Sequence, residues 1–425
     1  MSAAETIRSR DGDAEIVIVG ADPHGYYSRP GLAYLLAKEE LEKTLFPFTP
    51  QDIARLGARM LVDRVSSIDS STHTASLESG GTLEYDRLLI ATGSLAIPVN
   101  VPGAGLQGVV KLDDLDDARD LIARSRRAKA AVVVGGGITA LEIVEGLRER
   151  HVHVHYFMRR DRYWSNVLSE SESRIVEQGL QARGVQIHYY TELAEILGKD
   201  GKVVGVATQK GLQIPCDLVA VAIGVRPLKG LAEAAGLECG RGVLVDRFLR
   251  SNSEDIFAAG DVAEVRDTLS GQRVLEVLWG SAVDKGRVAG LNMATEPVHA
   301  YDKGPAPLNV TRLAGFKITI IGTVGSGKDS DLEGLARGDS QTWRDLGEAV
   351  MIESGNDDTH VRLAVAGGIL VGAVVMGDQA LSFPLQELIG ARADVSGRLA
   401  ALQEPSASVA NLVNGLWRES KANHV

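Results

Sequence analysis

The chain has 425 residues, of which 44% are hydrophobic and 24% charged, and its formal net charge is −11. This length predicts two to four domains, and the composition excludes a disordered or fibrous protein. The acidic balance repels a nucleic-acid backbone, so no nucleic-acid partner is expected.

Short runs of Val, Ile and Ala that lead into glycine recur along the first 300 residues. They predict parallel strands that run into tight turns, as in open α/β sheets that bind ligands at their strand ends. Helices with one apolar face are predicted over 141–150 and 170–182. The predicted strands cover 15–19, 87–91, 130–134, 152–157, 218–222 and 256–259.

Changes of composition predict the domain boundaries. Prolines and glycines within 97–108 separate a first unit from a second that ends near Pro227, and the chain then returns to the first unit. From about residue 301, closely spaced strands without long helices predict a smaller α+β domain. The tail has an amphipathic helical pattern, which we expect to pack on the protein's own body or on a subunit partner. The expected parts are 1–108, 109–227, 228–300, 301–400 and 401–425.

The strongest motif is AAVVVGGGITALE, residues 130–142, in which a buried strand leads into a glycine turn and a helix. Gly135, Gly137 and Ala140 follow the G-x-G-x-x-A arrangement. Gly135 permits the tight turn, Gly137 lets the backbone approach a pyrophosphate, and Ala140 allows close packing of helix on strand. The free N–H groups of the helix N-terminus would then face the phosphates. The alternative is a structural turn without a ligand.

The next strand ends at Met158, 21 residues beyond Gly137, where an NAD site usually places a carboxylate. Arg159 and Arg160 follow instead. Guanidinium groups pair with phosphate, so this end favours the 2′-phosphate of NADPH over NADH. The alternative is a pair of solvated surface arginines.

Two further segments, 88–94 and 256–264, are each expected to form a buried strand that ends in small residues. In the second, Asp261 stands where a helix would begin. Its carboxylate could accept hydrogen bonds from ligand hydroxyls, while the small neighbours admit the ligand's chain. The alternative role for this aspartate is a helix N-cap.

Together and in this order, these segments resemble the pyridine nucleotide-disulfide oxidoreductase superfamily over about residues 1–293. Within it, GADPHGYYSRPGLAYLL, residues 20–36, is similar to the loop of NADH-dependent rubredoxin and ferredoxin reductases and of the nitrite reductase flavin domain. The resemblance implies an α/β fold class: two Rossmann-like domains, for FAD and NAD(P), followed by a C-terminal α+β interface domain that forms a homodimer.

The same resemblance implies the residues that contact FAD. Tyr26, Tyr27 and Trp279 are expected to be packing residues, and Trp279 also to line the flavin pocket. The implied FAD contacts are Asp22 at the adenosine ribose, Arg29 and Pro30 beside the isoalloxazine, and Asp261 at the ribityl chain. Further cofactor-binding residues are implied at the glycine strand ends: Thr92 and Gly93 in ATGS, Gly224 in AIGVRP, and Gly260 in AAGD.

Two departures from that family bear on function. Residues 20–43 hold no cysteine, which excludes thiol-disulfide and peroxide chemistry by the family's route. In the family, the helix that matches residues 2–8 follows a strand and a G-x-G-x-x-G loop, which are missing before Met1. Because that strand is central in its sheet, we expect the true protein to begin upstream.

Cysteine usage and hydropathy predict a cytoplasmic protein without membrane contact. Cys216 and Cys239 lack the spacing of a redox pair or a metal knuckle. The apolar run 363–377 is shorter than the roughly 18 residues that span a bilayer, so two buried strands with a turn at Gly367 and Gly368 are predicted. The N-terminus lacks the apolar centre of a signal peptide.

Two other motifs are set aside. GTVGSGKD, residues 322–329, nearly matches a P-loop, but Asp329 stands where the Mg²⁺-binding hydroxyl should be and would repel phosphate. His151, His153 and His155 alternate along a predicted strand without nearby cysteines or paired carboxylates. A half-exposed sheet face is therefore preferred over a metal site. No metal ligand and no catalytic acid or base is predicted.

The expected function is that of an FAD-dependent NAD(P)H:acceptor oxidoreductase, with NADPH slightly favoured. Hydride would pass from nicotinamide to flavin, and electrons on to a rubredoxin, ferredoxin or other iron-sulfur protein. One alternative is an NAD(P)H oxidase or quinone-type reductase with a small acceptor. The other is a non-catalytic nucleotide-binding protein that has lost FAD.

Overall fold

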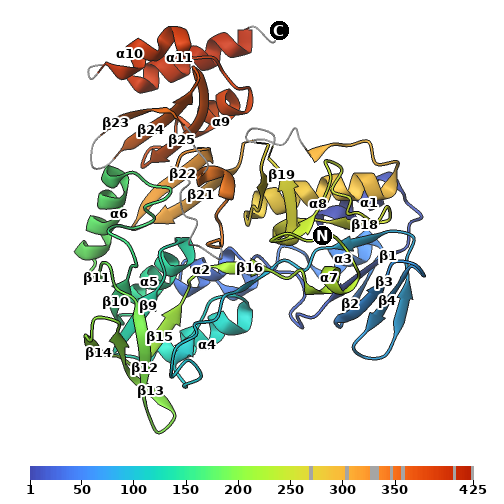
Figure 1. The fold of residues 1–425 in the computed structure, drawn as a ribbon, viewed down its shortest axis with the longest axis horizontal. Helices are drawn as coiled ribbons and strands as arrows, with labels where there is room; N and C mark the ends of the chain where they lie inside the picture. The colour runs from blue at the N-terminus through green and yellow to red at the C-terminus, as the bar shows by residue number, and fades with distance from the viewer. Residues whose placement is uncertain are drawn as a thin grey trace. The chain divides into compact units, whose positions relative to one another are not determined.

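The computed structural model describes residues 1–267, 271–301, 306–325, 335–344, 348–355, 359–404 and 408–422. Strands and helices are mixed throughout, so the α/β fold class is confirmed. The chain forms two compact units, each built from segments distant in sequence (Figure 1). Unit 1 is Met1–Ile97, Lys111–Ala123 and Gly224–Gly304, and unit 2 is Pro98–Val110, Arg124–Ile223 and Pro305–Val425.

Two separate pairs of parallel strands form the centre of unit 1. β1 (Ile16–Gly20) pairs with β2 (Ala58–Val62), and β18 (Ile256–Ala258) pairs with β6 (Leu88–Ile90). Within the described residues, no ladder joins the two pairs. A third sheet of this unit is antiparallel and is made of β3 (Val65–Asp69), β4 (Thr74–Leu77) and β5 (Thr82–Glu84).

Helices α1 (Ser2–Arg10) and α8 (Trp279–Ala294) lie side by side in unit 1 (Figure 1). Glycines on α8 make the close approach possible, since a Cβ at Gly290 would lie 2.6 Å from the carbonyl oxygen of Ala3. The remaining elements of unit 1 are short. They are α2 (Gly31–Leu36), η1 (Glu42–Leu45), α3 (Pro50–Leu56), β7 (Ser94–Ala96), the first part of α4 (Leu115–Ser125), β16 (Val225–Pro227), α7 (Gly230–Ala234), β17 (Val243–Leu244), η2 (Gly260–Val262), β19 (Ala263–Arg266) and β20 (Arg273–Val274).

A parallel five-stranded sheet is the first half of unit 2. Its order is β11 (Gln186–His188), β10 (His153–Phe157), β9 (Ala130–Val134), β15 (Leu218–Val221) and β8 (Val109–Val110). The central strand β9 buries Ala131, Val132 and Val133 completely. Helices α5 (Ile138–Glu149) and α6 (Glu170–Ala182) follow β9 and β10, and a meander of β12 (Leu193–Lys199), β13 (Lys202–Thr208) and β14 (Gln213–Pro215) completes this half.

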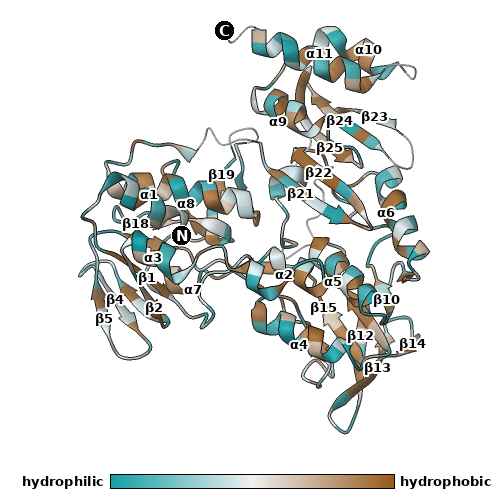
Figure 2. Ribbon diagram, turned by 180° about the vertical axis from the view of Figure 1, so that it is seen from behind, coloured by the Kyte–Doolittle hydropathy of each residue, from teal (hydrophilic) through white to brown (hydrophobic). Residues whose placement is uncertain are grey.

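The C-terminal half of unit 2 is an antiparallel sheet of order β21 (Leu308–Leu313), β22 (Phe316–Gly322), β25 (Ile369–Met376), β24 (His360–Ala366) and β23 (Val350–Gly355). Its strands are largely hydrophobic (Figure 2), and α9 (Ser382–Gly390), α10 (Leu399–Gln403) and α11 (Val409–Ala422) share their core. The two strands predicted within 363–377 are confirmed, with Gly367 and Gly368 in the turn at φ +56° and +81°. The tail helix packs on its own domain, as one of the two alternatives expected.

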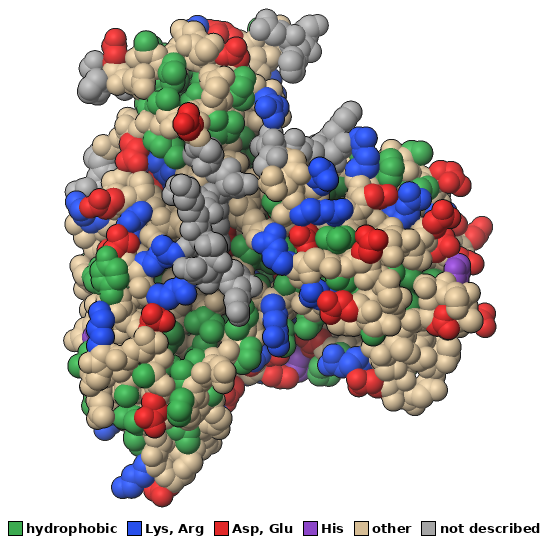
Figure 3. All heavy atoms as spheres, in the orientation of Figure 1, with side chains coloured by type: hydrophobic (Ala, Val, Ile, Leu, Met, Phe, Trp, Pro, Cys, Tyr) green, Lys and Arg blue, Asp and Glu red, His purple; other side chains and the backbone are tan. Residues whose placement is uncertain are grey.

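The predicted elements agree with the structure to within a residue or two, except that α5 begins at Ile138 instead of 141. The P-loop-like motif lies partly outside the described residues, because residues 326–329 are not described. In the described part of the chain, no helix is long and apolar enough to cross a membrane. Acidic and basic side chains are interspersed over the face shown in Figure 3.

Candidate cofactor-binding sites

The strand ends of unit 1 are lined by glycines. Gly20 is the last residue of β1, and Gly93 and Gly260 follow the carboxyl ends of β6 and β18. A Cβ at Gly20 or Gly93 would meet nothing within 4 Å, and Gly93 and Gly260 have φ of +72° and +77°. Backbone that faces open space at the carboxyl ends of parallel strands can lie against an extended ligand. These positions therefore fit a bound dinucleotide.

Asp261 is held in place from a neighbouring strand. The Ser94 hydroxyl on β7 donates a hydrogen bond of 2.6 Å to Oδ2 of Asp261 in η2. The N-cap of η2 is Ala259, without a side-chain cap, so the N-cap alternative for Asp261 is wrong. Thr92 turns away to donate to the Leu228 carbonyl at 2.8 Å. The two predicted residues therefore differ: Asp261 is held at the strand ends, whereas the Thr92 hydroxyl is hydrogen-bonded to the backbone.

A buried lysine lies behind Asp261, and sequence reasoning missed it. Lys285 on α8 is fully buried, with Nζ 3.4 Å from the Gly260 carbonyl oxygen and 3.5 Å from Oε2 of Glu276. The Tyr301 hydroxyl donates to the same oxygen at 3.1 Å, and burial raises the pKa of Tyr301, which keeps it a donor. A lysine between the small residues Ala282 and Gly286 was the signal available in the sequence.

The loop after β1 is organised around Asp22. Its carboxylate accepts hydrogen bonds from the Tyr27 hydroxyl at 2.8 Å and from the His24 backbone N–H at 3.0 Å. Burial raises the pKa of Tyr27 to about 12, so this hydroxyl stays protonated at neutral pH. Arg29 lies 3.8 Å from Asp22 and donates to the Asp113 carbonyl at 2.8 Å. The structure thus brings Asp22 and Arg29 close together, although each side chain makes a shorter hydrogen bond to another protein group.

Pro30 and Trp279 stand at helix starts in unit 1. Pro30 is the exposed N-cap of α2. Trp279 is the first residue of α8 and is 60% exposed, so the expectation that it is a packing residue is wrong. The cause is its position at the helix end, where the indole has no turn above it to cover it. Tyr27, by contrast, is buried as expected, and Tyr26 packs edge-on against Phe48 at 5.2 Å.

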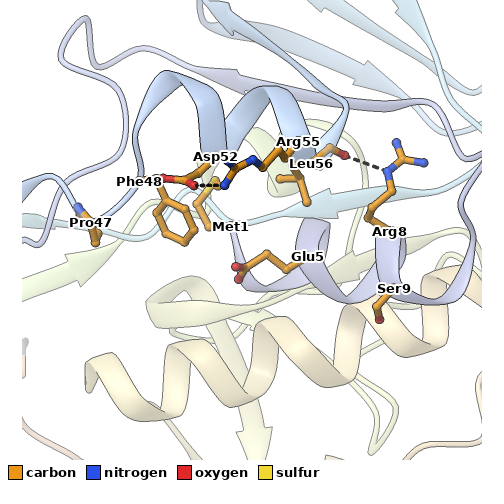
Figure 4. Close-up of a pocket in the computed structure, with 9 residues that line it drawn as sticks. All are labelled: Met1, Glu5, Arg8, Ser9, Pro47, Phe48, Asp52, Arg55 and Leu56. Atoms are coloured by element: carbon orange, nitrogen blue, oxygen red, sulfur yellow. Dashed lines mark hydrogen bonds and ion pairs between the residues drawn. The ribbon is translucent and has the colours of Figure 1, made fainter.

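A cavity of about 550 Å³ lies between α1 and α3 (Figure 4). Three of its charged side chains have protein partners: the Arg8 Nε donates to the Leu56 carbonyl at 2.8 Å, and Arg55 pairs with Asp52 at 3.5 Å. None of the predicted site residues lines it. The lining residues are Met1, Glu5, Arg8, Ser9, Pro47, Phe48, Asp52, Arg55 and Leu56.

In unit 2, the glycine turn has the geometry that the motif predicts. Gly135 follows β9 at φ +148°, and a Cβ there would lie 2.2 Å from the Ala222 carbonyl oxygen and 3.0 Å from the Ala140 Cβ. Only glycine fits this turn, and the small Ala140 allows α5 to pack against it. Gly136 faces open space. At Gly135, Gly136 and Ala140, the strand, turn and helix therefore have the shape that accommodates a pyrophosphate.

Gly137, the N-cap of α5, is covered by the C-terminal domain. A Cβ at Gly137 would lie 2.3 Å from the Cβ of Ala336. Ala336 is far downstream in the sequence, and no local pattern indicates this contact. In this structure, the Ala336 side chain therefore occupies the space beside Gly137 where the motif would place a pyrophosphate.

The other predicted cofactor residues differ in exposure, and Gly224 is half-buried. Arg159 and Arg160 are exposed in the turn that follows β10. Gly224 has φ +123°, and its carbonyl accepts a hydrogen bond from the Ile97 N–H at 2.9 Å. The two arginine side chains are thus accessible to a phosphate group.

The histidine trio differs from the one expected. His151 lies in a turn before β10 at φ +63°, while His153 and His155 are half-buried on β10. His188 of β11 takes the third place, its Nε2 3.1 Å from Nδ1 of His155. Burial, and then the neighbouring His153 and His188, lower the pKa of His155 to about 4. Among the described residues, no group of His, Cys, Asp and Glu could hold a metal ion.

Neither cysteine is poised to ionise at neutral pH. Burial raises the pKa of the Cys216 thiol to about 12, and burial also raises the pKa of the Cys239 thiol. A thiol must lose its proton before it acts as a nucleophile. These two side chains are therefore poor candidates for sulfur chemistry.

A family model and a curated relative both match this chain. The family model described as pyridine nucleotide-disulphide oxidoreductase matches residues 1–286. The ferredoxin–NAD(+) reductase component of the biphenyl dioxygenase system of Paraburkholderia xenovorans is 32% identical over 81% of this chain and 83% of its own length.

Solved structures share the fold. The ferredoxin reductase for the CYP199A2 system from Rhodopseudomonas palustris has a TM-score of 0.85 at 23% identity, covering 97% of this chain and 96% of its own. The covalent putidaredoxin reductase–putidaredoxin complex gives a TM-score of 0.85 at 22% identity, covering 99% of this chain and 96% of that chain.

Proposed function

Because the chain belongs to the pyridine nucleotide-disulphide oxidoreductase family, we propose that it takes hydride from NAD(P)H by means of FAD and passes the electrons to an iron-sulfur protein. The expected superfamily and cofactor classes are confirmed, and the chain is an FAD-dependent NAD(P)H oxidoreductase. One observation carries the proposal: each unit has a glycine-lined turn at the carboxyl end of a parallel strand.

In unit 1, we assign the FAD contacts to the strand ends. FAD, when bound, accepts a hydride and can release its electrons singly. Gly20 and Gly93 leave room for the ligand, and Asp261, fixed by Ser94, accepts hydrogen bonds from ligand hydroxyls. The buried Lys285 holds the Gly260 carbonyl and so sets the position of the Asp261 turn. Arg29 supplies a positive charge from the loop after β1.

In unit 2, we assign NAD(P)H to the turn between β9 and α5. The N–H groups at the start of α5 and its helix dipole attract the pyrophosphate. Arg159 and Arg160 would pair with a 2′-phosphate, which supports NADPH as the preferred donor. We name no acid or base for the hydride step, because protein groups only bind and orient the two coenzymes.

The relatives support an iron-sulfur acceptor. One is a ferredoxin reductase component, and another is a reductase solved in complex with putidaredoxin. For this chain we propose a ferredoxin or rubredoxin as the acceptor. We also propose a homodimer formed through the C-terminal domain and a location in the reducing cytoplasm, which two unpaired cysteines support.

Reconstitution with FAD tests the assignment in unit 1. The full chain, incubated with excess FAD and desalted, should retain flavin absorbance that NADPH bleaches under anaerobic conditions. Asp261→Asn should weaken FAD binding by about ten-fold or more, because a hydroxyl partner loses its charged acceptor. The matched control is Asp255→Asn in the same unit, where the carboxylate contacts only His73 at 3.5 Å among the described pairs. Equal FAD affinity in the two variants would refute the role of Asp261.

A further inference from the structure

A short segment of the C-terminal domain, residues 335–339, lies over the dinucleotide turn of unit 2; we call it the plug. We propose that the plug is autoinhibitory and that NAD(P)H binds only after the plug has left Gly137. This inference rests on the proposed function, since it concerns access to the same dinucleotide turn. It adds a device that controls that access.

The steric conflict is direct. The motif requires glycine at position 137 so that a ligand can lie against the backbone. In this structure that space is filled, because the Ala336 Cβ lies 2.3 Å from where a Cβ of residue 137 would be. Gly338 of the plug also contacts the helix start, since a Cβ there would lie 3.5 Å from Cδ1 of Ile138. A pyrophosphate and Ala336 cannot both occupy this place.

The plug is a defined turn with its own supports. The Asp339 N–H donates to the Ala336 carbonyl at 3.1 Å, which closes the turn, and Gly338 has φ +79°. The Asn309 side-chain amide on β21 donates to the Gly338 carbonyl at 3.0 Å. Leu335 and Asp339 are buried. Burial raises the pKa of Glu142 on α5, and the positive charge of Arg337 acts in the opposite direction and lowers it.

The C-terminal domain has other attachments to the nucleotide domain, away from the turn. Arg362 on β24 donates to Glu172 on α6 at 2.9 Å. The Glu145 carboxylate on α5 accepts hydrogen bonds from the backbone N–H groups of Ala314 and Gly315, in the turn between β21 and β22. Because these contacts do not involve the plug, the plug can leave Gly137 while the domain stays attached.

A blocked site lowers apparent affinity in proportion to the fraction of molecules that are open. A substitution that loosens the plug therefore tightens NAD(P)H binding, although it removes a contact from the protein. Asn309→Ala deletes the bond to Gly338 and should tighten NADPH binding by about three- to ten-fold. Asn411→Ala is the matched control, because Asn411 is exposed on α11 of the same domain.

The test is an NADPH titration of the FAD-loaded full chain, combined with hydrogen exchange read by mass spectrometry. We expect NADPH to raise exchange in residues 335–340 while it lowers exchange in residues 135–138, and Asn309→Ala to bind more tightly than Asn411→Ala. NADPH binding with unchanged or lower exchange in the plug would overturn the proposal and leave the function standing. Absence of binding in all variants, with no bleaching of the flavin by NADH or NADPH, would overturn the function as well.

If Asn309→Ala proves unstable, the wild-type exchange experiment decides alone. Arg337→Ala offers a second loosening variant, because Arg337 belongs to the plug and its charge acts on Glu142. We expect it to tighten NADPH binding as Asn309→Ala does. Weaker binding in both variants, with the fold intact by circular dichroism, would contradict an inhibitory plug.

Discussion

Arg362 and Glu172 form a buried ion pair between the C-terminal sheet and α6, with Nε 2.9 Å from Oε1 and side-chain exposures of 5% and 0%. The arginine also donates to the carbonyls of Val167 and Val324, so its donors join both halves of unit 2. His360 lies 3.4 Å from the same carboxylate oxygen. This cluster attaches the C-terminal domain to the nucleotide domain through buried polar contacts.

Removing the arginine should destabilise unit 2 strongly. Arg362→Met leaves Glu172 buried without its partner, which typically costs about 3–5 kcal/mol. The double variant Arg362→Met with Glu172→Leu should recover a large part of that loss. Urea unfolding followed by tryptophan fluorescence measures both. The control is Arg398→Met, whose exposed pair with Glu419 at 2.8 Å should contribute under about 1 kcal/mol. Equal losses for Arg362→Met and Arg398→Met would argue against the buried cluster.

The same pair predicts an acid limit of stability. Burial raises the pKa of Glu172, but the Arg362 charge and the hydrogen bonds outweigh it, so the pKa lies below its usual value. A carboxyl with a depressed folded pKa contributes stability above its unfolded pKa and loses that contribution as pH falls through the folded value. The wild type should therefore lose more stability than Arg362→Met on acidification below about pH 4.5. Parallel acid profiles of the two proteins would count against this assignment.

Two carboxyls of α5 predict the opposite slope near neutral pH. Burial raises the pKa of Glu142 and of Glu145 to about 7. A raised folded pKa gives stability that is present at low pH and is lost as pH rises through about 7. The charges facing Glu142 are Glu145 and Arg337, and those facing Glu145 are Arg183 and Glu149. Tyr163 interacts with both carboxyls, and Asp339 interacts with Tyr163.

Glu142→Gln isolates this effect. The variant cannot ionise at position 142, so its melting temperature should rise relative to that of the wild type as the pH increases from about 5 to about 8. This range runs roughly from the pKa of Glu142 in the unfolded chain to its pKa in the folded protein. Thermal melts at several pH values measure the difference. Glu195→Gln, an exposed position on β12 of the same unit, serves as the control. A pH-independent difference between Glu142→Gln and the wild type would show that burial does not shift this carboxyl.

Lys285 gives a prediction about the flavin turn. Lys285→Met leaves Glu276 buried without its cation and frees the Gly260 carbonyl, so both stability and FAD affinity should fall, the former by about 3 kcal/mol. Flavin fluorescence on release measures the FAD affinity. Arg287→Met on the same helix is the control, since its pair with Asp284 at 3.4 Å is exposed. If Lys285→Met lost stability but kept the FAD affinity of Arg287→Met, the lysine would not position the Asp261 turn.

Arg159 and Arg160 predict the choice of donor. Replacing both by alanine should lower kcat/KM for NADPH by about ten- to hundred-fold and leave the value for NADH nearly unchanged, because only NADPH carries the 2′-phosphate. The control is Arg174→Ala, an exposed arginine on α6. A strong preference of the wild type for NADH would contradict the arginine assignment outright.

Local patterns in the sequence predicted much of the fold. Residues 130–140 carry their own strand, turn and helix signals, and Gly135 and Ala140 are placed as predicted. The contact of Ala336 with Gly137 and the Arg362–Glu172 pair join positions far apart in sequence, which no periodicity encodes.

Two errors and one omission in the sequence predictions have simple physical causes. The alternation of histidines places His151 on the strand, but its positive φ puts it in the preceding turn. Trp279 was expected to pack, but a residue at the first position of a helix has no preceding turn to cover it, and it remains exposed. Lys285 is missed because charged residues in a sequence pattern are assigned to the surface. This lysine is buried only because the fold places Glu276 beside it.

We propose that this chain moves electrons from NAD(P)H through FAD to an iron-sulfur protein. The most direct measurement is anaerobic stopped-flow spectroscopy of the FAD-loaded full chain, mixed first with NADPH and then with an oxidised [2Fe-2S] ferredoxin. We expect NADPH to bleach the flavin and ferredoxin to restore its colour as the iron-sulfur centre is reduced. A flavin that neither NADPH nor NADH bleaches, or that oxygen or a quinone reoxidises while ferredoxin does not, would contradict it.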